Sequence, residues 1–370
     1  YTMRVFYLLA IVFVVDGHMS KGHMFEMNGL FRYYSFHLMM FAFGSGYFFK
    51  LYGKPLSDLL HRAKKLLIPL YFWNLVYGVG AALLRRLGGF ELGEPLSAYT
   101  LLLAPLADGE HFVWNLGSWF IFPFFCAQVF YALVRRLSSL WHENEWMTFL
   151  LCLIPGCVAV QLCYTGRQDI LPIWMLRPMI LLPGFAGGTL YRRVLERRDH
   201  LPTVPYLIGV VILRALLCTR YENLAYLLSD CSYFVCDAFG VYAGAALAIA
   251  FYLRISRLLA PYIGKSRLAL AISRNTFDVM MHHYMGFFAL NCFFLIVHIL
   301  GLGAADFSVH IFRTRSNYLY APDGRAEWSV LYLLCGVTLP LLIGHTARTV
   351  KTRLQACLSR RRKPESGSAR

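Results

Sequence analysis

Apolar stretches long enough to cross a lipid bilayer recur along the whole chain, separated by short polar segments. A helix needs about 17 to 25 mostly apolar residues to cross roughly 30 Å of hydrocarbon. Ten stretches of this kind cover residues 3–19, 35–52, 66–84, 118–134, 147–163, 171–191, 203–218, 235–255, 276–300 and 329–346. The pattern predicts an all-α, polytopic membrane protein with about ten transmembrane helices.

The overall composition agrees with this pattern. Of the 370 residues, 58% are hydrophobic and only 15% are charged, which is too apolar for an ordinary soluble protein of this size. We therefore expect a multi-pass protein of the cytoplasmic membrane. Residues 1–347 are expected to form one integral domain, followed by a basic cytoplasmic tail over residues 348–370.

The charges are distributed unevenly between the two sides of the predicted membrane. With ten spans both termini share a side, and 25 of the 36 Lys and Arg residues fall on that side. Because cytoplasmic loops carry the excess of basic residues, both termini are predicted to be cytoplasmic. The net charge of +16 then reflects topology and does not indicate nucleic-acid binding. The run Arg360-Arg361-Arg362-Lys363 is suited to anionic lipid headgroups.

Two outer segments are longer than the others, residues 85–117 and 302–328, and we expect them to influence acceptor specificity. Within the second, alternation over residues 307–312 and a turn at 321–324 indicate a short hairpin. The ten cysteines show no CxxC spacing, so no metal site is expected. Cys231 and Cys236, near an outer loop, could form a disulfide.

Arg4, Tyr7 and His18 fall on one face of the first predicted helix. Tyr7 and His18 are eleven residues apart, about three turns, and Arg4 precedes Tyr7 by about one turn. A titratable imidazole at membrane depth is costly and usually functional. His18 could take a proton from a hydroxyl as a general base. The alternative is a hydrogen-bonded structural histidine at a helix end.

The second predicted span places His37 at a depth similar to that of His18, with functional and structural roles both open. Its Gly44-Ser45-Gly46 run favours close helix packing for the two glycines. Arg62 and Lys65, at positions i and i+3, would share one face of a cytoplasmic helix. They could bind phosphate groups there, or simply contribute to the basic inner side.

Two later segments carry further candidates. Trp119, at the start of the fourth span, is most simply an interfacial anchor. Asp278 and His282, at positions i and i+4 of the ninth span, share a helix face. An acid and an imidazole stacked inside a membrane indicate a structural pair or a proton route.

The order and spacing of these segments resemble the membrane acyltransferase-3 family, especially its fucose 4-O-acetylase-like and polysaccharide O-acetyltransferase branch. The resemblance covers nearly the whole chain. It is carried by His18 after the apolar run 10–17, by residues 35–49, by Arg62 and Lys65 before residues 66–69, by Ser118-Trp119-Phe120, and by residues 273–283.

This resemblance implies transfer of an acyl group, most simply acetyl from cytoplasmic acetyl-CoA, to a hydroxyl of an extracytoplasmic glycan or lipid-linked sugar. Acetyl-CoA would be a substrate, with no bound cofactor. The resemblance makes His18 the catalytic histidine and places Arg62 and Lys65 at the CoA phosphates. Tyr7 stands where the family has a basic residue, and Arg4 could replace that charge. Lys65 stands where the family has arginine, and keeps the charge without the bidentate fork.

A transporter or flippase for lipid-linked sugars is the main alternative, since buried ionisable residues also mark such proteins. The sequence shows no repeated halves that would support it. A membrane sensor or scaffold would need no catalytic histidine. Transfer of labelled acetyl to a sugar acceptor distinguishes the enzyme from both.

Overall fold

The computed structural model describes residues 1–19, 24–107, 109, 112–140, 144–315 and 318–361, with side chains up to residue 357. Within this part of the chain there is no strand, which confirms the all-α fold. The basic run at residues 360–363 lies outside the described side chains. The principal helices are α1 (Thr2–Gly17), α2 (His37–Tyr47), α3 (Pro55–Gly88), η3 (Val113–Phe120), α4 (Ile121–Ser138), α5 (Glu145–Tyr164), α6 (Ile173–Leu190), α7 (Thr203–Arg220), α8 (Ala238–Ile263), α9 (Arg267–Arg274), α10 (Thr276–Ile299), α11 (Val309–Thr314) and α12 (Ser329–Arg361).

All ten predicted spans contain a helix, and eight of the helices in the described part of the chain are long and apolar enough to cross a membrane. The first two are shorter. α1 has 16 residues and α2 has 11, so their axes measure roughly 24 and 16 Å. α2 is shorter than its predicted span. Residues Tyr33–Ser35 form a short 3-10 helix instead, the backbone of Phe36 is not helical, and α2 ends at Tyr47. The chain is thus a polytopic membrane protein whose first two helices lie inside the bundle.

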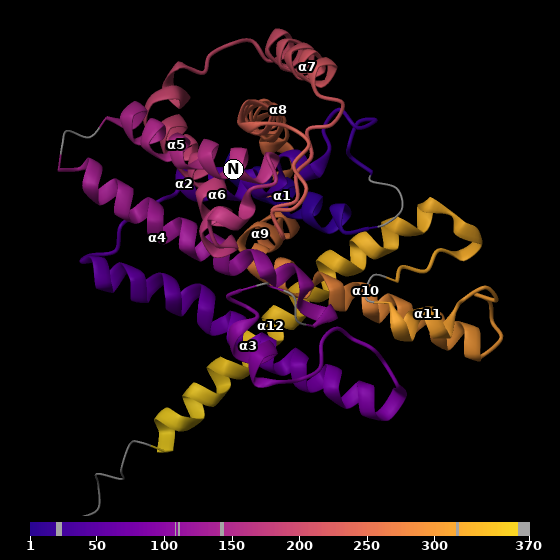
Figure 1. The fold of residues 1–370 in the computed structure, drawn as a ribbon. Helices are drawn as coiled ribbons and strands as arrows, with labels where there is room; N and C mark the ends of the chain where they lie inside the picture. Colours follow the sequence, from indigo (N-terminus) through magenta and orange to yellow (C-terminus); the bar gives the residue numbers. More distant parts are fainter. Residues whose placement is uncertain (20–23, 108, 110–111, 141–143, 316–317, 362–370) are drawn as a thin grey trace, which may run out of the picture.

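α1 and α2 occupy the centre of the molecule, between α6, α8 and α10 (Figure 1). Glycines allow α2 and α6 to approach each other closely. A Cβ on Gly46 would lie 1.9 Å from the carbonyl oxygen of Phe185, and a Cβ on Gly188 would lie 1.9 Å from that of Phe43. A packing role for the α2 glycines, expected from the sequence, is therefore confirmed.

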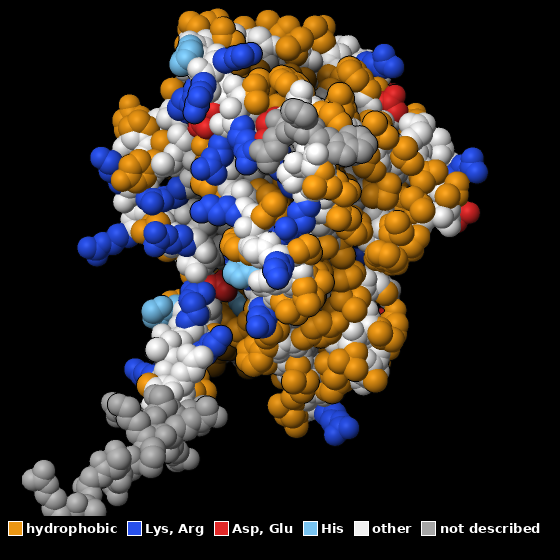
Figure 2. Space-filling view, turned by 90° about the vertical axis from the view of Figure 1, so that its left-hand side faces the viewer, with side chains coloured by type: hydrophobic (Ala, Val, Ile, Leu, Met, Phe, Trp, Pro, Cys, Tyr) orange, Lys and Arg blue, Asp and Glu red, His pale blue; other side chains and the backbone are white. Residues whose placement is uncertain are grey.

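The basic inner segments come together at one end of the molecule, which we call the basic end. Arg135 and Arg193 both form ion pairs with Glu145, each at 2.7 Å. The amino terminus lies here too, since a Cβ on Gly264 would be 2.9 Å from the Tyr1 Cβ. Figure 2, which views the molecule from the left of Figure 1, shows Lys and Arg side chains gathered across much of this face. The segments that the charge pattern assigns to one side are thus neighbours in space.

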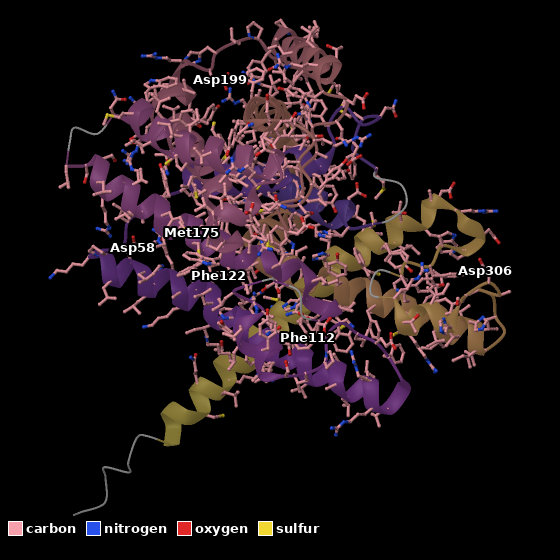
Figure 3. All side chains as sticks on the ribbon, viewed as in Figure 1. Asp58, Phe112, Phe122, Met175, Asp199 and Asp306 are labelled. Carbon is pink, nitrogen blue, oxygen red and sulfur yellow. The ribbon has the colours of Figure 1, made fainter. Side chains whose placement is uncertain are left out.

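The two long outer segments meet at the opposite end. The Glu91 amide donates a 2.7 Å hydrogen bond to the Arg313 carbonyl, and the Phe90 and Phe312 rings lie 5.5 Å apart. Asp58, at the start of α3, and Asp306, in the second outer segment, mark the two ends of the molecule (Figure 3). The chain therefore has a basic end and an end built from its long loops.

The hairpin expected in the second outer segment is wrong, and the possible disulfide between Cys231 and Cys236 is not formed. Residues 309–314 form helix α11 instead of a hairpin strand, because the Ser308 hydroxyl caps the helix by accepting from the Ile311 amide at 3.2 Å. Cys231 and Cys236 are both free thiols. The Cys231 thiol lies 3.7 Å from the Leu228 carbonyl oxygen of its own loop.

Candidate active site

His18 lies at the carboxyl end of α1, immediately after the last helical residue, Gly17. Its Nδ1 is 2.6 Å from the Val14 carbonyl oxygen. A carbonyl can only accept a hydrogen bond, so a neutral His18 carries its proton on Nδ1. The lone pair on Nε2 is then available, since no other hydrogen bond to His18 occurs among the described residues. This is the tautomer that a general base requires.

A cavity of about 260 Å³, which we call the His18 cavity, separates α1 from the loops around it. Its walls come from α1, α2, η3, α10 and the loop that contains residues 226–229. A second cavity of about 20 Å³, roughly the space of one water molecule, lies between His18 and the outer segments, where it is lined by Phe312, Arg315 and Tyr318. His18 thus lies between an internal chamber and the outer loops.

His37 lines the same cavity as His18, at the first turn of α2. Its Nδ1 is 2.5 Å from the Tyr33 carbonyl oxygen, so it adopts the same tautomer as His18. Tyr34 connects the two histidines: its hydroxyl donates to the Gly17 carbonyl at 3.0 Å, and its ring lies 5.4 Å from that of His37. The structure therefore brings these two predicted site residues together.

A third histidine, His283 on α10, also belongs to the site. Its ring centroid is 4.9 Å from that of His18, and its Nδ1 is 3.0 Å from the Val279 carbonyl oxygen. Its buried Nε2 has no hydrogen-bond partner among the described residues. Gly117 permits this arrangement, because a Cβ there would lie 2.4 Å from the His283 Cε1 atom. The adjacent pair of histidines in the sequence was the available signal for this residue.

His282 and Asp278 do not pair with each other. The His282 Nδ1 is 2.6 Å from the Tyr77 hydroxyl on α3, whereas Asp278 forms an ion pair at 2.5 Å with Arg348 on α12. The expectation of a pair is therefore wrong. The two side chains share a face of α10, but different helices cover its two turns and supply a nearer partner to each.

Trp119 forms part of the wall of the His18 cavity. The Arg177 guanidinium lies 5.4 Å from the Trp119 ring centroid, and Arg177 also donates to the carbonyls of Ala107 and Ser229. This buried cation connects α6 to two loops that border the cavity. The structure thus places Trp119 at the site, where a buried arginine holds it, and not in the position of a free interfacial anchor.

The other residues predicted on the first helix connect α1 to its neighbours. The Tyr7 ring packs against α2, where a Cβ on Gly44 would lie 2.7 Å from the Tyr7 hydroxyl oxygen. Arg4 donates to the carbonyl oxygen of Gly264 at the end of α8. Arg4 thus lies at the basic end, while Tyr7 and Ser45 lie at the contact between α1 and α2.

Arg62 and Lys65 occupy different environments. Arg62 is only 5% exposed and forms a 3.0 Å ion pair with Asp58. It also donates to the Gln128 side chain at 3.0 Å and to the Lys50 carbonyl at 2.8 Å. Lys65 is exposed at the surface. The two cations therefore do not converge on one site, and the Arg62 guanidinium is bound by protein groups.

Comparison with known proteins gives one match. No curated protein and no solved structure matches this chain. The model of a family described as an acyltransferase domain matches residues 8–346, which contain His18, His37 and His283 and extend from α1 into α12. The match covers nearly the whole chain and confirms the resemblance to the acyltransferase-3 family. This chain is therefore a membrane acyltransferase and belongs to the acyltransferase-3 family.

Proposed function

We propose that this membrane acyltransferase is an O-acetyltransferase of the polysaccharide-modifying branch, located in the cytoplasmic membrane. It moves an acetyl group from cytoplasmic acetyl-CoA to a hydroxyl of an extracytoplasmic glycan or lipid-linked sugar. The observation that carries the proposal is the geometry of His18. Its Nδ1 is held by the Val14 carbonyl at 2.6 Å, and its ring borders both the His18 cavity and the small cavity beneath the outer loops.

His18 acts as the general base for direct transfer. Nε2 takes the proton of the acceptor hydroxyl while that oxygen attacks the thioester carbonyl. A carbon–oxygen bond forms, the carbon–sulfur bond breaks, and the CoA thiolate leaves with the proton that the imidazolium returns. During this step the Val14 carbonyl keeps the ring oriented and accepts from Nδ1 as positive charge develops on the imidazole.

The two substrates approach from opposite ends of the protein. The acceptor enters beneath the outer segments, where Arg315 and Tyr318 border the small cavity next to His18. The donor enters from the basic end, where the exposed Lys65 attracts the CoA phosphates. Arg62 positions the donor entrance indirectly, because it holds the Lys50 backbone, beyond the end of α2, against α3. The thioester, at the end of a long flexible arm, reaches His18 between the helices.

The proposal is tested with purified protein in lipid nanodiscs, labelled acetyl-CoA and a panel of glycan acceptors. We expect His18→Ala to lower the rate of label transfer by about 10²- to 10⁴-fold, the usual contribution of a general base. His345→Ala is the control, because this histidine is exposed on α12. A correctly inserted His18→Ala variant with undiminished transfer would overturn the proposal. A transporter would give no label transfer with either protein.

A further inference from the structure

A second large cavity lies away from the His18 cavity. It has a volume of about 530 Å³ and is formed by α5, α6 and α8, with Met39 and Phe43 of α2 at its back and Tyr206 of α7 at one edge. Most of the lining side chains are apolar, among them Phe149, Leu153, Pro183, Leu190, Ile249 and Leu253. We call this feature the lateral groove, because its mouth lies between membrane helices.

The polar lining of the lateral groove is concentrated at the basic end. Trp146 lies in the first turn of α5 and is half exposed. Arg198 is exposed, and Asp199 is bound by Arg254 and by Arg257, the latter at 3.1 Å. Asp199 is labelled in Figure 3. The groove thus has an apolar body in the membrane and a cationic rim at the side that the charge pattern assigns to the cytoplasm.

Water is a poor occupant of this groove, because a bound water molecule needs two to four polar partners and the groove body provides few. A hydrocarbon chain from the surrounding bilayer needs no polar partners, and such chains are already present at this depth. The volume is within the range of ordinary ligand sites. The rim favours a ligand that carries a negative charge. Arg198 is exposed and has no ion-pair partner among the described residues, whereas Arg254 and Arg257 both pair with Asp199.

We propose that the lateral groove binds one acyl chain of an anionic glycerophospholipid from the cytoplasmic leaflet, with the lipid phosphate at Arg198. The bound chain packs against Met39 and Phe43. The same short helix carries His37 at its first turn, on the wall of the His18 cavity. The lipid therefore supports the back of the helix whose beginning forms part of the active site.

The acyl-chain part of the proposal is tested by filling the groove. Ala250→Phe places a ring in it, and Gly187→Leu places a branched aliphatic side chain in it from α6, where the nearest neighbour of a new Cβ would be 3.7 Å away. Ala243→Phe is the matched control, because Ala243 lines a separate groove between α7 and α8. Native mass spectrometry after delipidation and titration with phosphatidylglycerol measures lipid occupancy.

We expect the wild-type protein and Ala243→Phe to retain one phosphatidylglycerol per chain, and both filled variants to lose it. A phosphatidylglycerol with a photoreactive acyl chain should label residues 146–153 and 242–253. If the two filled variants keep wild-type occupancy, or the label lies elsewhere, the lateral groove is not the lipid site. Binding is measured without turnover, so the result does not depend on the proposed reaction.

The phosphate part is tested separately with Arg198→Gln and its exposed neighbour Arg197→Gln, which does not line the groove. Loss of one cation near an anionic headgroup should weaken phosphatidylglycerol binding about fivefold. Phosphatidylcholine, whose choline cation offsets the charge of its phosphate, should lose less affinity, and Arg197→Gln should behave as wild type. Equal binding of the two lipids, or an unaffected Arg198→Gln protein, would overturn the assignment of the phosphate to Arg198.

Discussion

The two ends of α2 show how buried polar side chains take different roles in one membrane protein: histidines surround its beginning, and Arg62 lies beyond its end. Around the beginning of α2, His18, His37 and His283 on α10 each use Nδ1 to bind a backbone carbonyl of their own segment, four residues earlier in the chain. Each ring keeps its other nitrogen. After α2, Arg62 is bound by Asp58, Gln128 and Lys50. An imidazole that keeps a lone pair on its second nitrogen can act on a substrate, whereas Arg62, held by three protein groups, stabilises the fold.

This comparison predicts a large loss of stability, and little direct loss of chemistry, for Arg62→Ala. Removal of the cation leaves the buried carboxylate of Asp58, in the first turn of α3, without its closest partner. The free energy of unfolding should fall by about 3–5 kcal/mol. Arg136 lies 3.3 Å from the same carboxylate and compensates in part. Thermal unfolding in detergent should show the loss, while kcat per folded molecule at saturating acetyl-CoA should remain close to wild type. Lys64→Ala, at another exposed position of α3, is the control for charge removal at the surface.

His283→Gln tests the histidines around the beginning of α2. Glutamine keeps a polar group beside His18 but cannot replace the imidazole, so we expect kcat to fall about tenfold, roughly the value of one hydrogen bond to a charged group. Thermal stability should change little. The matched variant His282→Gln alters the Tyr77 contact and should affect stability more than kcat. If the two variants exchange these behaviours, His283 is the structural histidine of the pair.

Lys65→Gln should have a smaller effect, confined to the donor. Lys65 is exposed, and an exposed ion pair contributes about 0.2–1 kcal/mol. The KM for acetyl-CoA should therefore rise about two- to fivefold, with kcat unchanged and a weaker effect at high salt. An unchanged KM at low ionic strength would remove Lys65 from the donor entrance.

Asp278→Asn should have the smallest effect of the series. Its partner, Arg348, has a side chain that is 52% exposed and can be solvated when the pair is broken. We expect a change below about 1 kcal/mol in the free energy of unfolding, measured by chemical denaturation. Activity should be unchanged, because neither side chain lines the His18 cavity. A large loss of activity would instead support a proton route through Asp278.

Much of the fold could be predicted because membrane helices leave a strong local signal. All ten apolar segments contain helices, and the segments with the most basic residues gather at one end. His18 and His37, expected at a similar depth, line one cavity. The failures are local and have physical causes. Residues 307–312 alternate like a strand, but the Ser308 cap makes a helix there.

The candidate site was harder to predict, because its membership depends on the rotation of each helix. His282 and His283 are adjacent, and a step of one residue turns a helix by about 100°, so only one can face α1. The i and i+4 spacing of Asp278 and His282 favours that pair from sequence, yet α12 and α3 supply other partners. Periodicity gives the faces of a helix but not the neighbour that each face meets.

The sequence by itself determined the membrane class, the helical segments and the basic segments, and it made His18 a candidate, because apolar length, charge bias and an imidazole in an apolar run are local properties. Tertiary structure alone decided that His283 joins His18, that Arg62 pairs with Asp58 and Gln128, and that a lateral groove lies behind α2. These features depend on contacts between segments far apart in the chain, such as Gly46 against Phe185. Close packing of glycines sets those distances, and no single segment contains that information.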